Sequence, residues 1–568
     1  MSDWQESYDL VIVGSGGGSM CAALIAQQLG KKALIIEKLD KVGGSTGYSG
    51  GVWWVPNNAI MKRHGVDDTY ERARLYLDSA VTYDGPGTSP IRREAFLKTG
   101  PLMVDFLERK GMAFEYADGW SDYYDDLPGG EPRGRSLVAK LFNIKELGDW
   151  SSKLSRYLGP GIPATSDEFP TLFLMKRTWA GKKKAMQLGL RMLKQKILGQ
   201  EVLGGGAAIQ GRMLQIALRH QLPIWTDTPV TDLVVEDGRV TGVVATRNGQ
   251  SIRIQGRDGV LVNVGGFSRN ADMRKQYQPQ PSSAKWTNAN PGDTGEVIQA
   301  AIKQGAAVDC MDEAWWVVTS LGPDESFPQG AVAANGVPLP FMHHLDLSLP
   351  YSIMVDQDGV RFCDEAGAYM EIGQRMYRRQ AQTGKAVPAW VVMDSRQRKF
   401  YPWGNAMPGQ VPQQWLDSGY MIKADSLEEL AGKCGIDCAG LLATVERFNG
   451  FCSTGVDLDY GRGSRAFDRC HGDPSVKPNP NLGSIEEGPF YAVRMYPGDV
   501  GTAGGLVTDE FARVLRDDGS VIEGLYATGN STAGVSGRCY PGAGTSIAAS
   551  FTFAYIAAQH SAGVEKIW

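Results

Sequence analysis

Apolar and polar positions at the start of the chain predict one strand–helix–strand unit. Residues 8–13 (YDLVIV) predict a buried strand, and the glycine-rich residues 14–18 that follow predict a tight turn. The Ala/Leu-rich residues 20–29 predict a helix that ends at Gly30, and residues 33–37 (ALIIE) predict a second strand. This order over about thirty residues is typical of a βαβ unit with parallel strands.

Three later stretches extend this pattern. Residues 66–109 predict helix. Residues 224–264 predict a small sheet, in which residues 236–238 and 247–249 are hairpin turns. From Gly501 onward the glycine-rich pattern of strands returns, and the chain ends in a long apolar helix.

The middle of the chain differs, because residues 313–490 are richer in aromatic residues and proline and lack the glycine-rich pattern. We therefore expect an α/β protein with a Rossmann-like nucleotide-binding domain that is discontinuous in sequence. Its two parts are residues 1–312 and 494–568. An inserted α+β substrate or catalytic domain is expected at residues 313–493.

Composition narrows the class of protein. Of the 568 residues, 42% are hydrophobic and 21% are charged, which is typical of a folded globular protein and excludes a disordered chain. The formal net charge is −5, so no basic field predicts a nucleic-acid partner. Glycine is unusually frequent, with 71 residues, and it gathers beside apolar runs. The backbone is therefore expected to approach a bound cofactor closely in several places.

The cysteine pattern disfavours a metal site. The eight cysteines are scattered without a C-x-x-C pair, and Cys434 and Cys438 lack partners at metal-ligand spacing. The six histidines stand singly except for His343-His344, so we expect no bound metal. Free thiols, the lack of a signal-peptide pattern and the lack of a bilayer-spanning apolar run favour a cytoplasmic location.

One basic segment, residues 169–197, leaves two interpretations open. It mixes Leu, Met, Phe and Trp with many Lys and Arg and contains no acidic residue. That composition is typical of an amphipathic segment on an anionic surface, such as the inner face of a membrane. A solvated surface helix with an ordinary packed face explains it equally well.

The glycine turn carries the first chemical signal. Gly14 permits the tight turn, and Gly16 lets the backbone approach a pyrophosphate at the helix N-terminus. Ser19 stands where the third glycine of the G-x-G-x-x-G pattern is usual. Glu37 ends the second strand, where a carboxylate can bind a ribose hydroxyl. These features predict an adenine dinucleotide.

A second Gly/Ser/Thr loop at residues 42–51 suits a longer ligand, and a third piece, residues 524–530 (GLYATGN), lies near the far end of the chain. Together the three pieces resemble the flavoprotein family of fumarate reductases and 3-ketosteroid dehydrogenases over nearly the whole chain. The resemblance implies that the Rossmann-like domain is an FAD-binding domain. Because no histidine stands in residues 43–51, we expect non-covalent FAD.

The motifs and the resemblance together give a set of expected FAD contacts. They are Gly14, Ser15, Gly16, Gly17, Gly18, Glu37, Lys38, Gly43, Gly44, Ser45, Thr46, Ser49, Gly50, Gly51, Gly205, Gly206, Val230, Gly265, Gly529, Asn530, Gly544, Ser546 and Ile547.

A second motif bears on the substrate. Residues 361–365 (RFCDE) resemble the Arg-Phe-x-Asn-Glu of fumarate reductases, in which an arginine a few residues later donates a proton. Here Tyr369 stands in that place. A dicarboxylate requires arginines, whereas a neutral ketone requires hydrogen-bond donors and an apolar wall. Arg538 is still available, so the dicarboxylate alternative is weakened but stays open.

Residues 540–544 (YPGAG), directly before the last helix, resemble the 3-ketosteroid Δ1-dehydrogenases. The first N–H groups of a helix have no partner within it, so the Gly544 N–H and the Tyr540 hydroxyl can form a two-donor oxyanion hole. Residues 122–124 (DYY) resemble an Asp-Tyr-Tyr of the same subgroup whose first tyrosine is catalytic, which corresponds to Tyr123. Residues 312–316 (DEAWW) fit either a pocket wall or the core.

The resemblance implies a reaction on a 3-keto steroid. Tyr540 and Gly544 are expected to polarise the C3 carbonyl, Tyr369 to take a proton from C2, and Tyr123 to relay it, while hydride leaves C1 for FAD. The product has a 1,2 double bond, and an external acceptor such as a quinone reoxidises the flavin. Three alternatives stay open: a 3-ketosteroid Δ4-dehydrogenase, a fumarate-reductase-type enzyme, and a flavin-binding module without turnover.

Overall fold

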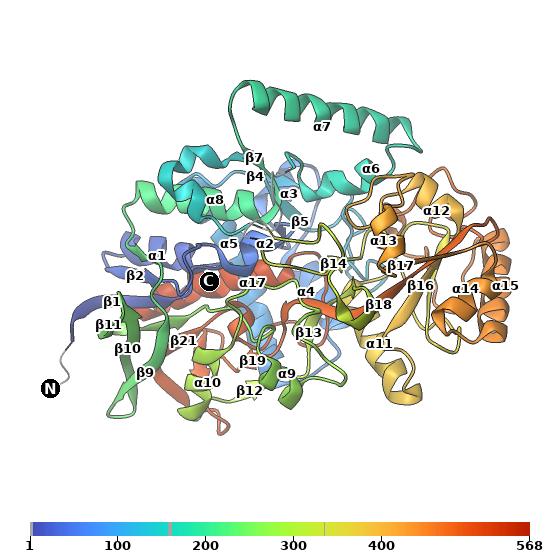
Figure 1. The fold of residues 1–568 in the computed structure, drawn as a ribbon. Helices are drawn as coiled ribbons and strands as arrows, with labels where there is room; N and C mark the ends of the chain where they lie inside the picture. Colours follow the sequence, from blue (N-terminus) through green and yellow to red (C-terminus); the bar gives the residue numbers. More distant parts are fainter. Residues whose placement is uncertain (1–3, 157–161, 334–335) are drawn as a thin grey trace.

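The predicted βαβ unit forms the centre of the larger of two main sheets (Figure 1). The computed structural model describes residues 4–156, 162–333 and 336–568. Strand β1 (Glu6–Val13) pairs in parallel with β2 (Ala33–Ile36) and with β11 (Gln250–Val262), and α1 (Ser19–Gln28) connects β1 to β2. Within these ranges the sheet has the order β20-β21-β11-β1-β2-β8, and β10 and β9 extend from β11.

The strand β11 corrects one prediction. Residues 224–264 do not form a separate small sheet, because the runs SIRIQ and GVLVNV belong mostly to this single strand. Its first half pairs antiparallel with β10 (Arg239–Arg247), and its second half pairs in parallel with β1 and β21 (Val521–Ala527). Strand β1 pairs with residues 254–262 of β11, with a register shift between Tyr8 and Leu10. The other strands of this sheet are β8 (Ile224–Trp225), β9 (Val230–Glu236) and β20 (Arg513–Leu515).

Side chains on the two faces of β1 enter two different cores. Leu10 and Ile12 pack into the core that contains α1, α5 (Pro90–Lys110) and α17 (Thr545–Ser561). Val11 and Val13 enter the core on the opposite face, because successive side chains of a strand alternate. That second core includes residues of β9, β10, α9 (Ala271–Tyr277) and α10 (Glu296–Lys303).

The second main sheet lies at the other end of the molecule (Figure 1). In the described part of the chain it has the order β14-β13-β18-β16-β15, with β17 paired to β18. Its strands are β13 (Ala314–Ser320), β14 (Phe341–Met342), β15 (Ser352–Val355), β16 (Ala389–Met393), β17 (Met421–Ala424) and β18 (Phe490–Thr502). The domain limits stay a prediction, and the limit expected between residues 493 and 494 lies inside β18.

Helices and small sheets complete the fold. The stretch 66–109 contains two helices rather than one, because a turn around Pro86 separates α4 from α5. The remaining helices are α2 (Gly44–Tyr48), α3 (Ala59–Arg63), α4 (Tyr70–Ala80), α6 (Phe169–Phe173), α7 (Trp179–Ile197), α8 (Gly205–Arg219), α11 (Tyr369–Thr383), α12 (Ser395–Phe400), α13 (Gln413–Asp417), α14 (Leu427–Cys434), α15 (Cys438–Thr454) and α16 (Ala466–Cys470). Short strands are β3 (Val52–Trp54), β4 (Phe114–Tyr116), β5 (Ser136–Ala139), β6 (Phe142–Asn143), β7 (Val202–Leu203), β12 (Val308–Asp309) and β19 (Gly505–Leu506).

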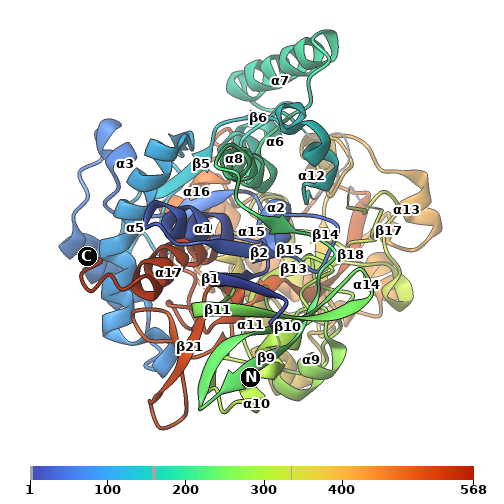
Figure 2. The ribbon, with the colours of Figure 1, turned by 90° about the vertical axis from the view of Figure 1, so that its left-hand side faces the viewer.

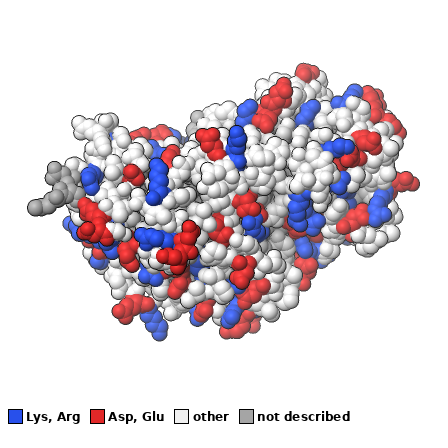
Figure 3. Space-filling model, turned by 90° about the horizontal axis from the view of Figure 1, so that it is seen from below, with Lys and Arg blue, Asp and Glu red and all other residues white. Residues whose placement is uncertain are grey.

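Helix α7 stands away from the body of the protein (Figures 1 and 2). Gly181 is its one fully buried residue, and Trp179 is 84% exposed. Within the described ranges, no helix is long and apolar enough to cross a bilayer. On the face shown in Figure 3, which is seen from the side opposite α7, acidic and basic side chains are interspersed.

Candidate active site

The glycine turn between β1 and α1 packs tightly against protein at two of its glycines and leaves free space beside a third. Gly14 has φ +93°, and a Cβ there would lie 2.2 Å from the Asn263 carbonyl oxygen. A Cβ on Gly18 would lie 2.4 Å from the Ala554 Cβ of α17. At Gly16, by contrast, the nearest atom is 3.9 Å away, in Gly44. The turn therefore packs against the sheet and α17 and leaves room beside Gly16, where a pyrophosphate would pass.

Glu37 lies beside this turn, as the sequence predicts. The Ser15 amide and hydroxyl donate to its Oε2 at 3.0 and 2.6 Å, and the Leu39 amide donates to its Oε1 at 2.9 Å. Burial raises the pKa of the Glu37 carboxyl, although these hydrogen bonds act against the rise. The Thr228 amide donates to the Glu37 carbonyl at 2.9 Å, which brings the nearby Val230 to the same end of the site.

Lys38 does not face the turn. Its Nζ donates to Glu296 at 3.0 Å and to Thr294, and this ion pair is partly exposed. The Nζ of Lys38 is thus bonded to protein, and the contact of this residue with the dinucleotide stays a prediction.

The second loop packs directly on the first. The Gly17 amide donates to Thr46 Oγ1 at 3.1 Å, and the Gly206 amide donates to the Ser49 carbonyl at 2.9 Å. A Cβ on Gly51 would lie 2.2 Å from the carbonyl carbon of Gly205. Residues 14–18, 43–51 and 205–206 thus form one continuous wall, although they are far apart in the sequence. We call these residues the glycine wall.

Asp293 joins further predicted residues to this wall. Ser45 Oγ donates to Asp293 Oδ2 at 2.8 Å, so the Ser45 hydroxyl is bonded to protein. A Cβ on Gly265 would lie 2.4 Å from the other carboxylate oxygen, Oδ1. The backbone of Gly265 is therefore held close to the second loop. Burial raises the pKa of the Asp293 carboxyl to about 7.

Two buried polar atoms beside Gly43 have no hydrogen-bond partner among the described residues. They are Gln210 Oε1 and Ser155 Oγ. A Cβ on Gly43 would lie 3.2 Å from the Gln210 side chain and 3.6 Å from that of Ser155. Buried polar atoms normally have partners. The hydroxyls and phosphates of a dinucleotide would supply them, so these residues fit such a group.

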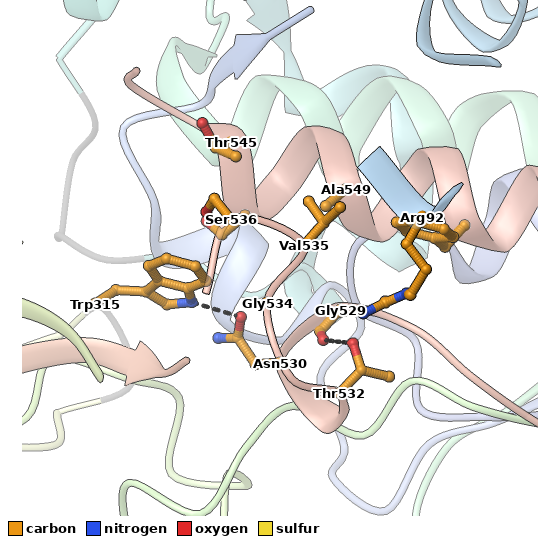
Figure 4. Close-up of a pocket in the computed structure, with 12 residues that line it drawn as sticks. Arg92, Trp315, Gly529, Asn530, Thr532, Gly534, Val535, Ser536, Thr545 and Ala549 are labelled. Carbon is orange, nitrogen blue, oxygen red and sulfur yellow. Dashed lines mark hydrogen bonds between the residues drawn. The ribbon is translucent and has the colours of Figure 1, made fainter. Parts of the chain in front are cut away.

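The C-terminal piece closes the wall (Figure 4). Gly529 has φ +64°, and Asn530 Oδ1 accepts a hydrogen bond from Trp315 Nε1 at 2.9 Å. The Gly18 amide donates to Ser550 Oγ of α17 at 3.2 Å. A small pocket lies between the loop 529–536 and one face of α17, and Gly529, Asn530 and Ser546 are among its lining residues. Ile547 is partly buried against the adjoining core.

Three phenol side chains meet between the two main sheets. Tyr123 comes from the loop after β4, Tyr369 is the first residue of α11, and Tyr540 lies in the loop before α17. The ring centroids are 5.6 Å apart for Tyr123 and Tyr369, 5.4 Å for Tyr369 and Tyr540, and 5.7 Å for Tyr123 and Tyr540. We call these residues the phenol triangle.

The electrostatics of the phenol triangle favour neutral phenols. Burial raises the pKa of Tyr369 well above its usual value of 10, and the neighbouring Tyr123 and Tyr540 raise it further. Burial likewise raises the pKa of Tyr123. A resting enzyme therefore holds both groups protonated at neutral pH.

The two expected ketone-binding donors lie side by side. The Gly544 amide donates to the Tyr540 hydroxyl oxygen at 3.1 Å, and that hydroxyl shares a hydrogen bond of 3.1 Å with Ser546 Oγ. Gly544 has φ +84°, and a Cβ there would lie 1.7 Å from the Val52 carbonyl oxygen, so a side chain would clash. For both donors to bind one carbonyl oxygen, the phenol must move off the amide.

A buried ion-pair network holds the loop that carries Tyr123. The Tyr123 amide donates to the Pro541 carbonyl at 3.0 Å, which joins this loop to the C-terminal segment. Next to it, the fully buried Asp122 accepts from Trp54 Nε1 at 2.8 Å and pairs with Arg135. Removing either partner of a buried pair leaves an uncompensated charge, so this network fixes the position of Tyr123.

Three aromatic neighbours of the phenol triangle complete its walls. The Phe467 ring lies 4.3 Å from Tyr123, the His344 ring 5.7 Å from Tyr369, and the Trp315 ring 4.8 Å from Tyr540. The sequence showed Trp315 as a pocket or core residue, whereas nothing in the pattern singled out Phe467. His344 was visible as half of a histidine pair, but its place beside Tyr369 depends on the fold.

Arg538, the residue left for a dicarboxylate, is bound to protein carboxylates. Its Nη1 donates to Asp312 at 2.8 Å and to Glu313 at 3.1 Å. These two acids pair with the guanidinium, so an anionic substrate would have to compete with Asp312 and Glu313. This contact weakens the fumarate-reductase alternative further.

All eight cysteines are free, and five of them are buried. Cys434 ends α14 and Cys438 begins α15, so the two residues lie on separate helices. Among the residues with described positions, no group of three or more His, Cys, Asp or Glu side chains is placed to hold a metal ion.

Comparisons with known proteins agree with this geometry. Residues 9–547 match the family described as FAD binding domain. The chain is 41% identical over 574 residues to a 3-oxosteroid 1-dehydrogenase of Mycobacterium tuberculosis (strain ATCC 25618 / H37Rv), a match that covers 98% of each chain. It is 32% identical to a 4-oxocyclohex-2-ene-1-carboxylate 5-dehydrogenase of Sinomonas cyclohexanicum, over 97% of this chain and 93% of that one.

A solved structure shows the same fold. It is a 3-ketosteroid delta1-dehydrogenase from Sterolibacterium denitrificans in complex with 1,4-androstadiene-3,17-dione, with a TM-score of 0.91 and 37% identity over 99% of this chain and 100% of that chain. The predicted α/β flavoprotein fold and the predicted FAD are thereby confirmed. The chain belongs to the FAD-binding family of flavoproteins, among the relatives of the 3-oxosteroid 1-dehydrogenases, and it is an FAD-dependent oxidoreductase.

Proposed function

We propose that this protein is a 3-ketosteroid Δ1-dehydrogenase, which introduces a 1,2 double bond into 3-keto steroids. The observation that carries the proposal is the phenol triangle, whose third member, Tyr540, lies 3.1 Å from the Gly544 amide at the start of α17. The printed activity of the relative with 41% identity and the steroid bound in the similar solved structure support the same substrate class.

The proposed roles follow from the position of each group. The Tyr540 hydroxyl and the Gly544 N–H bind the C3 carbonyl oxygen and stabilise the negative charge that develops there, at about 3 kcal/mol for each donor. This acidifies the C2 hydrogens. In its phenolate form, the minor form at neutral pH, Tyr369 removes the C2 proton, and Tyr123, whose ring centroid lies 5.6 Å from that of Tyr369, hydrogen-bonds to it and relays the proton onward.

The walls of the site serve the same reaction. The glycine wall would hold FAD, which would supply the acceptor for the hydride that leaves C1. Trp315 and Phe467 pack against Tyr540 and Tyr123 and offer an apolar surface of the kind that a steroid ring requires. They also exclude water, which strengthens the two hydrogen bonds to the carbonyl.

The decisive experiment mixes the oxidised protein with a 3-keto-4-ene steroid without oxygen. We expect the yellow flavin absorbance to bleach, and mass and NMR analysis of the product to show a new 1,2 double bond. A double bond at C4–C5 from a saturated 3-keto steroid would identify a Δ4-dehydrogenase instead. Flavin that stays oxidised with every ketone would indicate a binding module.

Relatives that act on single-ring keto acids suggest a comparison of two substrates. The single-ring compound 4-oxocyclohexanecarboxylate carries a ketone, as a 3-keto steroid does, but also a carboxylate. The arginine considered for an anion, Arg538, is paired with Asp312 and Glu313. We therefore expect the steroid to be oxidised at a much higher kcat/KM than this acid. A higher kcat/KM for this acid than for the steroid would contradict the steroid substrate but not the introduction of a double bond next to a ketone.

We also propose that reduced FAD passes its electrons to an external acceptor such as a quinone. The reaction leaves two electrons on the flavin in each turnover, so another molecule must take them before the next turnover. Single-turnover reoxidation rates with a soluble quinone and with oxygen would test this. Faster reoxidation by oxygen than by the quinone would contradict it.

The exposed helix α7 supports a proposed contact with an anionic membrane surface. Met186, Leu190 and Ile197 are 63%, 60% and 73% exposed and follow one another at helical spacing, with lysines on the flanking positions. Glu168 fixes the base of this helix through Lys184 at 2.9 Å and Arg191 at 2.7 Å. Burial acts in the opposite direction, but these ion pairs lower the pKa of Glu168 to about 2.

Liposome co-sedimentation tests this contact. The protein with Met186, Leu190 and Ile197 replaced by serine should lose most of its binding to vesicles that contain anionic lipid. Replacement of the exposed Leu458, which is 77% exposed and far from α7 in the sequence, is the control and should change nothing. Equal binding by all three proteins would remove the membrane proposal.

A further inference from the structure

Arg92, near the start of α5, is a buried cation without an acidic partner. It is 1% exposed, and its Nη1 donates to the carbonyl oxygens of Gly87 and, at 3.2 Å, Ala533. Its Nε has no hydrogen-bond partner, and no carboxylate oxygen of the described residues lies within 4.0 Å. Two other buried arginines have acidic partners: Arg135 pairs with Asp68 and Asp122, and Arg274 pairs with Asp499.

The guanidinium of Arg92 faces the cofactor side of the molecule. Arg92 lines the same small pocket as Gly529, Asn530 and Ser546, and these three are expected FAD contacts. Figure 4 shows the guanidinium end directed toward the loop that carries Gly529 and Thr532. The Phe553 ring of α17 lies 4.8 Å from the guanidinium carbon and closes the far side.

This arrangement is unfavourable for the protein alone. A cation taken out of water needs a partner, and carbonyl oxygens compensate it only in part. Burial lowers the pKa of Arg92 to about 10, whereas Asp509 and Asp309 act in the opposite direction from beyond contact distance. Asp309 accepts from the Gly87 amide at 3.1 Å and from the Tyr83 hydroxyl at 2.7 Å. At neutral pH the guanidinium is therefore charged.

The reaction creates the missing negative charge. A hydride carries two electrons and one proton, so its transfer from C1 makes the flavin more negative by one charge, while the C2 proton leaves separately. A fixed positive charge near the cofactor stabilises the product of this step more than the starting state. We propose that Arg92 is a positioning residue that raises the reduction potential of bound FAD through its unpaired charge.

The test measures the reduction potential of the bound flavin against a dye of known potential, without oxygen and without steroid. The variant Arg92→Gln keeps a hydrogen-bond donor but removes the charge. We expect the ratio of reduced to oxidised flavin, at a fixed dye ratio, to fall about tenfold, which corresponds to about 30 mV for two electrons. Arg92→Lys keeps the charge and should retain most of the original ratio.

Arg398 offers a matched control. It is 2% exposed, it donates to the Gln397 side chain and the carbonyl oxygens of Tyr401 and Gln410, and its Nε also lacks a partner in the described structure. Because it packs in the second sheet region, away from the glycine wall, Arg398→Gln should leave the potential unchanged. An equal shift in this variant would mean that any buried-arginine defect lowers the potential.

A variant with the opposite sign covers the case in which Arg92→Gln does not fold. Asp309→Asn keeps one of the two acceptor oxygens, which serve Tyr83 and Gly87, and removes an offsetting negative charge, so the reduced fraction should rise. An unchanged potential in Arg92→Gln or, if that protein is unfolded, in Asp309→Asn overturns the proposal. The inference depends on FAD and not on the steroid, so its failure would leave the proposed substrate and reaction intact.

Discussion

The two halves of the proposed active site are built in opposite ways. The glycine wall consists mainly of backbone, and at Gly14, Gly18 and Gly51 a Cβ would lie 2.2–2.4 Å from another segment. The phenol triangle consists of side chains that three separate loops and helix ends bring together. The cofactor half thus depends on glycines at fixed spacing in the sequence. The substrate half depends on large side chains that come together from separate segments.

The largest expected effect falls on the substrate half. Tyr369→Phe removes the proposed base but keeps the ring, so we expect turnover to fall about 10²–10⁴-fold, the usual contribution of a positioned base. The flavin content, read from its absorbance, and the steroid Kd should stay nearly the same. Turnover within a few-fold of the original would show that the base is another group.

A matched glycine pair tests the cofactor half. At Gly16 a methyl group meets no protein atom within 3.9 Å, so Gly16→Ala should fold normally. If FAD fills that space, its affinity should fall about tenfold to a hundredfold, because overpacking costs about 1–3 kcal/mol. Titration of the apoprotein with FAD measures this. Unchanged affinity would place the pyrophosphate elsewhere.

Gly14→Ala is the other member of that pair. With φ +93° and a Cβ 2.2 Å from the Asn263 carbonyl oxygen, the substitution strains the backbone of the protein itself. We expect the free energy of unfolding to fall by about 2–4 kcal/mol, as judged from the melting temperature of the apoprotein. If Gly14→Ala and Gly16→Ala change stability equally, the wall does not have the closed and open sides described above.

The phenol triangle should also impose a pH dependence that the glycine wall does not. Burial and two neighbouring phenols raise the pKa of Tyr369, so the fraction of the deprotonated base grows about tenfold per pH unit below that pKa. We expect kcat/KM to rise from pH 7 toward alkaline pH, while FAD affinity stays level. A kcat/KM that falls over this range would contradict a tyrosine base.

Ser546→Ala gives the smallest expected change, and it acts where the two halves touch. The Ser546 hydroxyl shares its hydrogen bond of 3.1 Å with Tyr540. Loss of one such bond changes the free energy by about 0.5–1.5 kcal/mol, so kcat/KM should fall about 2- to 10-fold. A loss as large as that of Tyr369→Phe would give Ser546 a direct role in the chemistry.

The contrast between the halves explains what the sequence could predict. The glycine pattern indicated the βαβ unit, the turn and Glu37, because backbone geometry follows from local residue types. The two hairpins predicted in residues 224–264 form, but their strands join the larger sheet, because strand pairing over long distances is not encoded locally. The ion pair of Lys38 with Glu296, which lies far along the chain, could not be predicted either.

The substrate half was accessible only through resemblance. The short stretches around Tyr123, Tyr369 and Tyr540 pointed to a known subgroup, and the structure brings all three together. Their roles stay a proposal, because proximity does not show proton transfer. The sequence did not single out Phe467 or Arg92. The contact of Phe467 with the distant Tyr123 and the burial of Arg92 without an acidic partner become visible only in three dimensions.

The bond between the Tyr123 amide and the Pro541 carbonyl has a consequence for biosynthesis. The C-terminal stretch supplies Tyr540 to the substrate side and Ser550 to the glycine turn, so neither half is complete while the ribosome is still translating codon 540. A polypeptide that ends before residue 540 therefore lacks groups of both halves. We expect it neither to bind FAD normally nor to catalyse the proposed reaction.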